Sequence, residues 1–267
     1  CLEMNSIRQT VGTVNGAIAA IKAGIDIVMI SHTYELQKSV LEALVREVET
    51  GGISRQTIDD AYSRVCALKD RYLSWKDIPS SLTGLQLPKE VGGKHHRELA
   101  EEIYRQGVTI YRNEGMTIPV TGESKVLVIY PAAGNVTMVE DVHYSACSLG
   151  NAVTEVHPGA DTLTISVNPD KEEIKAAVEK AEGYGTIIAG THSAVHNPGQ
   201  AELVNSLLKK GLRVIAVAMK SPYDITCFKD VQAYIATYEH SYPALRQAAR
   251  AIFGLDEVKG EMPVTIP

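Results

Sequence analysis

The chain has 267 residues, of which 45% are hydrophobic and 22% are charged, and its formal net charge is -6. This length leaves room for one large domain or two modest ones. The negative charge gives no basic surface for a nucleic-acid partner. No stretch approaches 18 uninterrupted apolar residues, so we expect no membrane span.

The first third of the chain alternates helical and strand-like patterns. Three helices are predicted at 13–24, 35–49 and 54–73, and one strand is predicted at 25–30. Ser54 is a natural N-cap for the last of these helices. The strand, IDIVMI, is continuously apolar, and a strand between two helices cannot bury both of its faces alone. We therefore interpret residues 1–73 as the last part of a larger βα assembly.

The rest of the chain predicts a linker and an α/β domain. Pro, Gly and Ser crowd into residues 74–93 without periodicity, which is typical of a linker. Beyond it the predicted strands are 108–111, 125–130, 162–167, 186–189, 213–218 and 232–237, and the predicted helices are 94–107, 171–182, 198–210 and 243–253. Continuous apolar strands between amphipathic helices indicate a parallel sheet covered on both faces. Residues 94–267 therefore predict a doubly wound, three-layer α/β sandwich domain.

Short motifs along nearly the whole chain carry a family resemblance. They are AIAAIKAGIDIVMISH at 17–32, the helical segment 51–73, VTIYRNEGMTIP at 108–119, SPYD at 221–224, ATY at 236–238, ALR at 244–246, FG at 253–254 and GEMPVTIP at 260–267. In this order they resemble the C-terminal portion of glycoside hydrolase family 3, in its two-domain β-N-acetylglucosaminidase (NagZ-like) branch. The resemblance implies that residues 1–73 are the end of a (β/α)8 barrel with its post-barrel helices, and it implies no cofactor.

The start of the chain matches part of that family's nucleophile motif. The family's catalytic Asp ends the seventh barrel strand in a pattern like D-[CDS]-[LM]-x-M, and residues 1–4 (CLEM) match the part after the Asp. The resemblance implies that the nucleophile immediately precedes Cys1 and that the acid/base lies further upstream. We therefore expect no catalytic residue within this chain, and we expect the chain alone to be inactive.

Two residues are candidates for lining the substrate. His32 follows a barrel-type strand at its C-terminal end, where such enzymes place their sites. It is expected either to contact a sugar hydroxyl or to cap the following helix. Met4 is expected either to line the apolar face of the sugar or to be a plain core methionine. We interpret Glu3 as a helix-start carboxylate near the positive end of a helix dipole.

No metal site is predicted. The cysteines, Cys1, Cys66, Cys147 and Cys227, lack metal-ligand spacing and are expected to be free and mostly buried. His95 and His96 are adjacent on a predicted helix and point in different directions, and His192 and His196 have no third ligand nearby. Tyr223, Asp224 and His240 are expected to have structural roles.

Two classes of function follow. The first is a retaining β-N-acetylglucosaminidase that acts on N-acetylglucosamine-containing saccharides from cell wall or chitin, with this chain as its C-terminal part and the N-terminal barrel portion as its partner. A phosphorylase of the same family is a variant of it. The second is a non-catalytic α/β structural or binding module. The resemblance to two-domain members suggests an extracellular or cell-wall-associated location.

Overall fold

The computed structural model describes residues 1–74, 76, 88–122, 124–132 and 148–267. The chain forms two compact units, Cys1–Gln86 (unit 1) and Leu87–Pro267 (unit 2). Most of the predicted linker, 74–93, lies outside the described residues.

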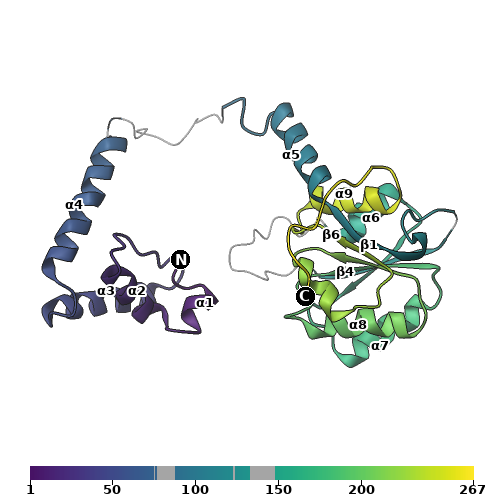
Figure 1. Cartoon of the computed structure of the whole chain (residues 1–267), viewed down its shortest axis with the longest axis horizontal. Coiled ribbons are helices and arrows are strands. Elements are labelled where there is room, and N and C mark those ends of the chain that lie inside the picture. Colours follow the sequence, from purple (N-terminus) through teal and green to yellow (C-terminus); the bar gives the residue numbers. More distant parts are fainter. Residues whose placement is uncertain (75, 77–87, 123, 133–147) are drawn as a thin grey trace. The chain divides into compact units, whose positions relative to one another are not determined.

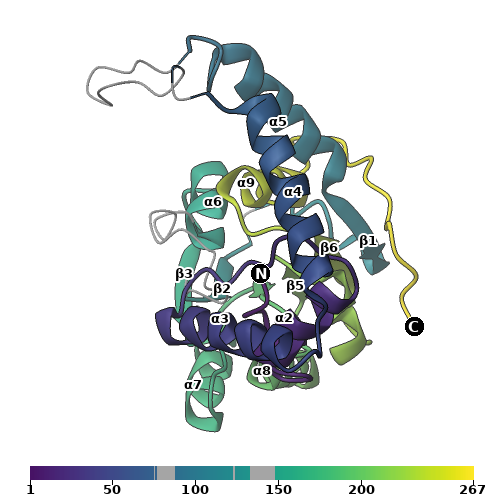
Figure 2. The same ribbon diagram turned by 90° about the vertical axis from the view of Figure 1, so that its left-hand side faces the viewer.

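Unit 1 is helical. Its helices are α1 (Asn5–Arg8), α2 (Thr13–Lys22), α3 (Tyr34–Glu49) and α4 (Arg55–Tyr72). Helix α2 packs against α3 (Figure 1, Figure 2). The predicted N-cap of α4 is confirmed, because the hydroxyl of Ser54 accepts a hydrogen bond from the backbone N–H of Thr57 at 3.1 Å.

The predicted buried strand at 25–30 is wrong in this structure. The segment has no strand geometry, and unit 1 offers it no neighbouring strand among its described residues. A strand is stable only where its N–H and C=O groups pair with a neighbour. The segment is held instead by contacts that include a backbone bond, from the N–H of Leu2 to the carbonyl of Met29, and an ion pair in which the guanidinium of Arg64 donates to the carboxylate of Asp26 at 2.8 Å and 2.9 Å.

Unit 2 contains a mainly parallel sheet. Its described strands are β1 (Thr109–Asn113), β2 (Val126–Pro131), β3 (Asp161–Ile165), β4 (Thr186–Thr191), β5 (Val214–Ala218) and β6 (Ala233–Ala236). They lie in the order β1-β6-β5-β4-β2-β3. All neighbours pair in parallel except β1, which is antiparallel to β6. The predicted doubly wound α/β sheet is therefore confirmed, with an antiparallel strand at one edge.

Helices cover both faces of this sheet (Figure 1). One face carries α6 (Leu149–Val156) and α9 (Tyr242–Ile252), and the other carries α7 (Lys171–Ala181) and α8 (Pro198–Lys209). Successive residues of β2 face alternate sides: Val126 and Val128 join the α6–α9 core, whereas Leu127 and Ile129 join the α7–α8 core. Helix α5 (Lys94–Gly107) contacts α9.

The described helices include none that combines the length and the apolar character needed to cross a bilayer.

Two glycines, Gly199 in α8 and Gly107 in α5, allow a test of how closely α8 packs against the segment before α7. A Cβ at Gly199 would collide with the carbonyl oxygen of Pro169, whereas a Cβ at Gly107, the last residue of α5, would meet nothing within 4 Å. We expect Gly199→Ala to lower the free energy of unfolding of unit 2 by about 1–3 kcal/mol. Gly107→Ala should leave it unchanged or raise it by up to about 1 kcal/mol. Denaturant unfolding of both variants measures the difference, and equal effects would contradict the packing described.

Candidate functional site

Two segments that are far apart in sequence lie side by side in unit 1. The backbone N–H of Leu2 donates to the carbonyl of Met29 at 2.9 Å, and the carbonyl of Leu2 accepts from the hydroxyl of Thr13 at 3.1 Å. These bonds bring residues 1–4 next to the loop at 31–33. The two segments carry the two substrate-lining candidates, so the structure brings those candidates to one region.

The side chain of Glu3 joins these segments. It is only 8% exposed, and its carboxylate accepts three backbone N–H bonds. Atom Oε2 accepts from Ser31 at 2.7 Å and from His32 at 2.8 Å, and Oε1 accepts from Thr33 at 3.0 Å. These residues directly precede α3, so Glu3 is a helix-start carboxylate as expected, although the helix is α3 and not α1.

The hydrogen bonds also fix the charge of Glu3. The side-chain bond from Thr33 is the largest effect, and with the backbone bonds it lowers the pKa of Glu3 to about 2, while burial acts in the opposite direction. Hydrogen bonds to the charged form of a carboxylate favour that form. Glu3 is therefore an anion at neutral pH, and it stays one in mildly acidic solution.

The two substrate-lining candidates differ in their surroundings. The side chain of His32 is 42% exposed, and its Nδ1 lies 3.5 Å from Oε2 of Glu3. Met4 is 63% exposed, so it is not a core methionine of unit 1 as described here. Their contact with a sugar stays a prediction.

The same region contains three potential metal ligands. Cys1, Glu3 and His32 place one ligand atom each within 4.8 Å of one another. Thiolate, carboxylate and imidazole all suit zinc. However, Oε2 of Glu3 already accepts two N–H bonds and Oε1 a third, so most of the acceptor sites of this carboxylate are occupied by the loop at 31–33. The chemistry of the donor set therefore fits a loop-capping carboxylate better than a metal centre.

The other histidine pairs do not form a metal site among the described residues. His95 and His96 are exposed, with ring centroids 6.3 Å apart. His192 is buried and packs edge-on against His240 at 5.0 Å, whereas His196 is exposed. Neither pair belongs to a group of three potential ligands in the described parts of the chain.

The cysteines were expected to be free and mostly buried. Cys1, Cys66 and Cys227 are free. The expected burial is wrong for Cys1, which is exposed, whereas Cys66 and Cys227 are partly buried and Cys227 packs against the α7–α8 core. Cys147 lies outside the described residues.

A second buried carboxylate lies in unit 2. Asp224 is fully buried, and its Oδ2 accepts from the hydroxyl of Thr191 at 2.7 Å. Burial raises the pKa of Asp224, and hydrogen bonds from Thr191 and from the backbone after β4 oppose that shift. These contacts fit the structural role expected for Asp224. Tyr223 is exposed and makes its described bond through its carbonyl, which accepts from the hydroxyl of Thr226.

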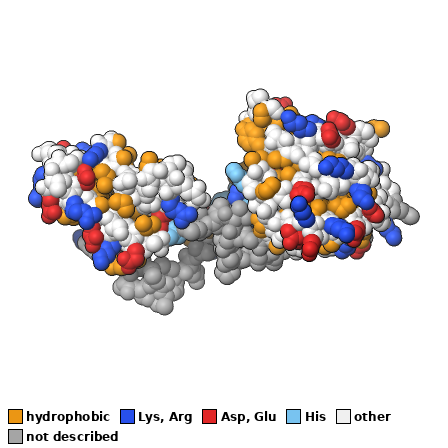
Figure 3. All heavy atoms as spheres, turned by 90° about the horizontal axis from the view of Figure 1, so that it is seen from below, with side chains coloured by type: hydrophobic (Ala, Val, Ile, Leu, Met, Phe, Trp, Pro, Cys, Tyr) orange, Lys and Arg blue, Asp and Glu red, His pale blue; other side chains and the backbone are white. Residues whose placement is uncertain are grey.

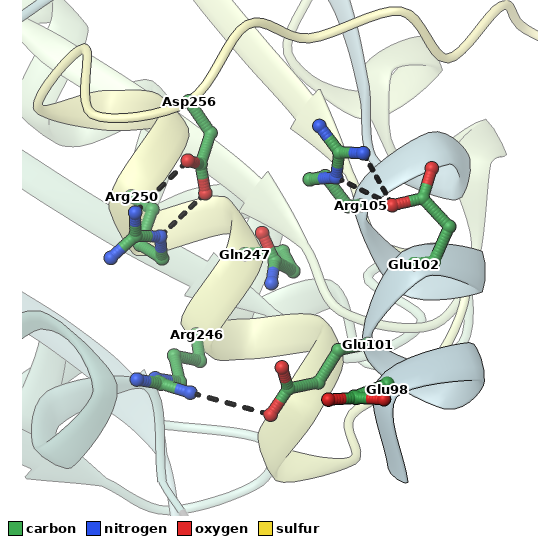
Figure 4. Close-up of a pocket in the computed structure, with 8 residues that line it drawn as sticks. All are labelled: Glu98, Glu101, Glu102, Arg105, Arg246, Gln247, Arg250 and Asp256. Carbon is green, nitrogen blue, oxygen red and sulfur yellow. Dashed lines mark hydrogen bonds and ion pairs between the residues drawn. The ribbon is translucent and has the colours of Figure 1, made fainter. Parts of the chain in front are cut away.

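A charged cleft of about 310 Å³ lies between α5 and α9 (Figure 4). Its arginines pair with carboxylates of the protein: Arg105 with Glu102, Arg246 with Glu101 and Glu155, and Arg250 with Asp256. Among the described residues that line the cleft, none is an aromatic side chain on which a sugar ring could stack. Because its charges neutralise one another, the cleft is a weaker candidate for the functional site than the Glu3 region.

Sequence reasoning missed the partners of Glu3. They are backbone N–H groups 28–30 positions later in the chain, and a backbone donor carries no residue-type signal. The hint in the sequence was an acidic residue three positions after the expected nucleophile.

Comparison with known proteins gives a consistent set of relatives. No protein-family model matches the chain. Beta-hexosaminidase A of Pseudoalteromonas piscicida is 22% identical over 298 residues, which cover 99% of this chain and 48% of that protein. The chain thus spans about half the length of this curated relative.

Two solved structures are similar over the whole chain. A glycoside hydrolase family 3 β-N-acetylglucosaminidase from Paenibacillus sp. str. FPU-7 is 31% identical with a TM-score of 0.79, covering 98% of this chain and 49% of that one. A fungal multi-domain β-N-acetylglucosaminidase of the same family is 30% identical with a TM-score of 0.76, covering 100% of this chain and 30% of that one.

The low pKa of Glu3 predicts how unit 1 responds to acid. Because the pKa falls from 4.5 to about 2 on folding, the carboxylate stabilises unit 1 fully above pH 4.5, and this contribution is lost as the pH falls through about 2. We expect Glu3→Gln to lower the unfolding temperature of unit 1 at neutral pH. The difference from wild type should shrink between pH 4.5 and about 2. Circular dichroism melts measure it, with Glu35→Gln, an exposed residue of α3, as the control. A difference that does not change with pH would contradict the assignment.

Proposed function

Because this chain belongs to glycoside hydrolase family 3, we propose that the whole protein is a retaining β-N-acetylglucosaminidase. Its substrates are N-acetylglucosaminides such as cell-wall or chitin fragments. The names of the similar proteins, a hexosaminidase and two β-N-acetylglucosaminidases, support this substrate class. The observation that carries the proposal is the pairing of residues 1–4 with the loop at 31–33, which is how two neighbouring strand-end loops of a barrel would meet.

The proposed chemistry uses a carboxylate that directly precedes Cys1. This carboxylate attacks the anomeric carbon while a general acid outside this chain protonates the departing oxygen, so a glycosyl ester forms and the aglycone leaves as an alcohol. The same acid, now a base, then takes a proton from water. The resulting attack on the anomeric carbon breaks the ester, restores the carboxylate and releases the sugar with its original β configuration.

The described residues supply the walls of this proposed site. The imidazole of His32 is half-exposed and can hydrogen-bond a sugar hydroxyl, and the exposed thioether of Met4 can pack against an apolar sugar face. Neither residue carries a reacting group. The expected inactivity of the chain by itself follows from this division of roles.

We also propose that the rest of the whole protein covers an apolar surface of unit 1. Ile25, Ile27 and Met29 are 51%, 64% and 62% exposed, and they occupy alternate positions. Exposed hydrophobic side chains are visible on the face of unit 1 that Figure 3 displays. Alternation with a period of two is the pattern of one face of a strand. The proposal is that residues 25–30 pair as a barrel strand once neighbouring strands are present.

The activity is tested on the whole protein and on this chain in parallel. We expect the whole protein to hydrolyse 4-nitrophenyl N-acetyl-β-glucosaminide, with the β anomer as the first product seen by proton NMR. We expect no turnover by the chain of 267 residues. Addition of inorganic phosphate separates the variants of the proposal, since a phosphorylase would form N-acetylglucosamine 1-phosphate. Formation of the α anomer first, or no activity in the whole protein, would overturn it.

The proposed cover of unit 1 is tested by placing a charge on it. Ile27→Asp should destabilise the whole protein by about 3 kcal/mol or more, because apolar burial is lost and an unpaired carboxylate is buried. It should leave the melting of this chain nearly unchanged, since Ile27 is exposed here. Ser63→Asp, on the exposed surface of α4, is the control. Equal tolerance of both substitutions in the whole protein would count against a covered surface.

A further inference from the structure

We propose that Glu3 is a positioning residue of the sugar site and that it acts through His32. This inference rests on the proposed function and names a residue that supports the site without touching the reacting atoms. It is carried by four contacts that converge on one buried carboxylate: two backbone N–H bonds to Oε2, a third to Oε1, and the imidazole Nδ1 at 3.5 Å.

The backbone of the loop at 31–33 takes its hydrogen-bond acceptors from Glu3. Residues 31–33 belong to no helix or strand, and their N–H groups donate to no backbone carbonyl among the described bonds. Glu3 is therefore their acceptor. A carboxylate that accepts several N–H bonds at 2.7–3.0 Å holds the loop in one conformation, because charge-assisted hydrogen bonds are short and strong.

The imidazole of His32 lies beside the same carboxylate. His32 donates its own backbone N–H to Oε2, and its Nδ1 lies near the same oxygen. A carboxylate beside one ring nitrogen favours a proton on that nitrogen. The neutral ring then has its acceptor lone pair on Nε2. Glu3 thereby selects both the place of His32 and the tautomer that can accept a hydrogen bond from a sugar hydroxyl.

The exposure of His32 distinguishes a role in the sugar site from simple stabilisation. The loop could be fixed without consequence for the sugar if His32 pointed into a core, but its side chain is 42% exposed. A displacement of about 1 Å in a substrate-contacting group can cost about 100-fold in rate. Loss of the Glu3 carboxylate should therefore appear in turnover and not merely in stability.

The test is a double-mutant cycle in the whole protein. Glu3→Gln, His32→Ala and the double variant are compared with wild type on 4-nitrophenyl N-acetyl-β-glucosaminide, with rates expressed per folded molecule. Each single variant should lower kcat by about 10- to 100-fold with a much smaller change in KM. The double variant should be no slower than His32→Ala, because residues that act as a unit are not additive. Glu35→Gln should retain wild-type rates, since Glu35 is exposed.

A milder variant covers the case in which Glu3→Gln does not fold. Thr33→Val removes the side-chain hydrogen bond to Glu3 and leaves the carboxylate in place. It should lower kcat by a smaller factor, and this factor should vanish in the His32→Ala background.

The outcomes distinguish this inference from the proposed function. An active wild type whose Glu3→Gln or Thr33→Val variant keeps full kcat would overturn the inference alone. So would losses that multiply in the double variant, which would indicate a structural role independent of His32. A wild type without N-acetylglucosaminidase activity would overturn the proposed function and the inference with it.

Discussion

The buried carboxylate of Glu3 is the interaction on which the N-terminal unit depends. Unit 1 has no sheet among its described residues, so the segments that would be strand ends must be held by other means. Three N–H bonds to one anion join positions that are 28–30 residues apart. An ionised group is costly to bury unless it is hydrogen-bonded. Glu3 satisfies this condition, and it supplies hydrogen-bond acceptors to the N–H groups of residues 31–33. The buried carboxylate therefore needs the loop, and the loop needs the carboxylate.

Unit 2 also contains a loop that is held by side-chain hydrogen bonds, at the end of β4. The loop that follows this strand is fixed by side chains: Thr191 donates to Asp224, the backbone N–H of His192 donates to Gln200 at 2.7 Å, and the amide of Asn197 donates to the carbonyl of His192 at 3.0 Å. Ser193 in this loop has a positive φ of 57°, a strained conformation that these contacts maintain. The units differ in that unit 2 contains a paired sheet, whose inner strands β2, β4, β5 and β6 are buried on both faces.

The local pattern of apolar residues in the sequence predicted most of the helices and strands of unit 2. Strands β2, β4 and β5 were expected within two residues of their ends, because each is a short apolar run between polar boundaries. The antiparallel direction of β1 was not expected, since strand direction depends on the connection and not on composition. Helix α6 was missed because its eight residues are too few to show a clear helical periodicity. At 25–30 the apolar run was recognised, but the neighbours that would make it a strand are not among the described residues of unit 1.

The sequence by itself determined the family resemblance, the α/β class of unit 2 and the assignment of Met4 and His32 to one candidate region. These conclusions depend on motifs and periodicities that are properties of short segments. Only the tertiary structure decided what Glu3 does, why a cluster of Cys1, Glu3 and His32 is a poor metal centre, and which apolar residues of unit 1 lie exposed. The physical reason is that hydrogen-bond partners and burial are set by the path of the chain, which brings together groups with no local relation in sequence.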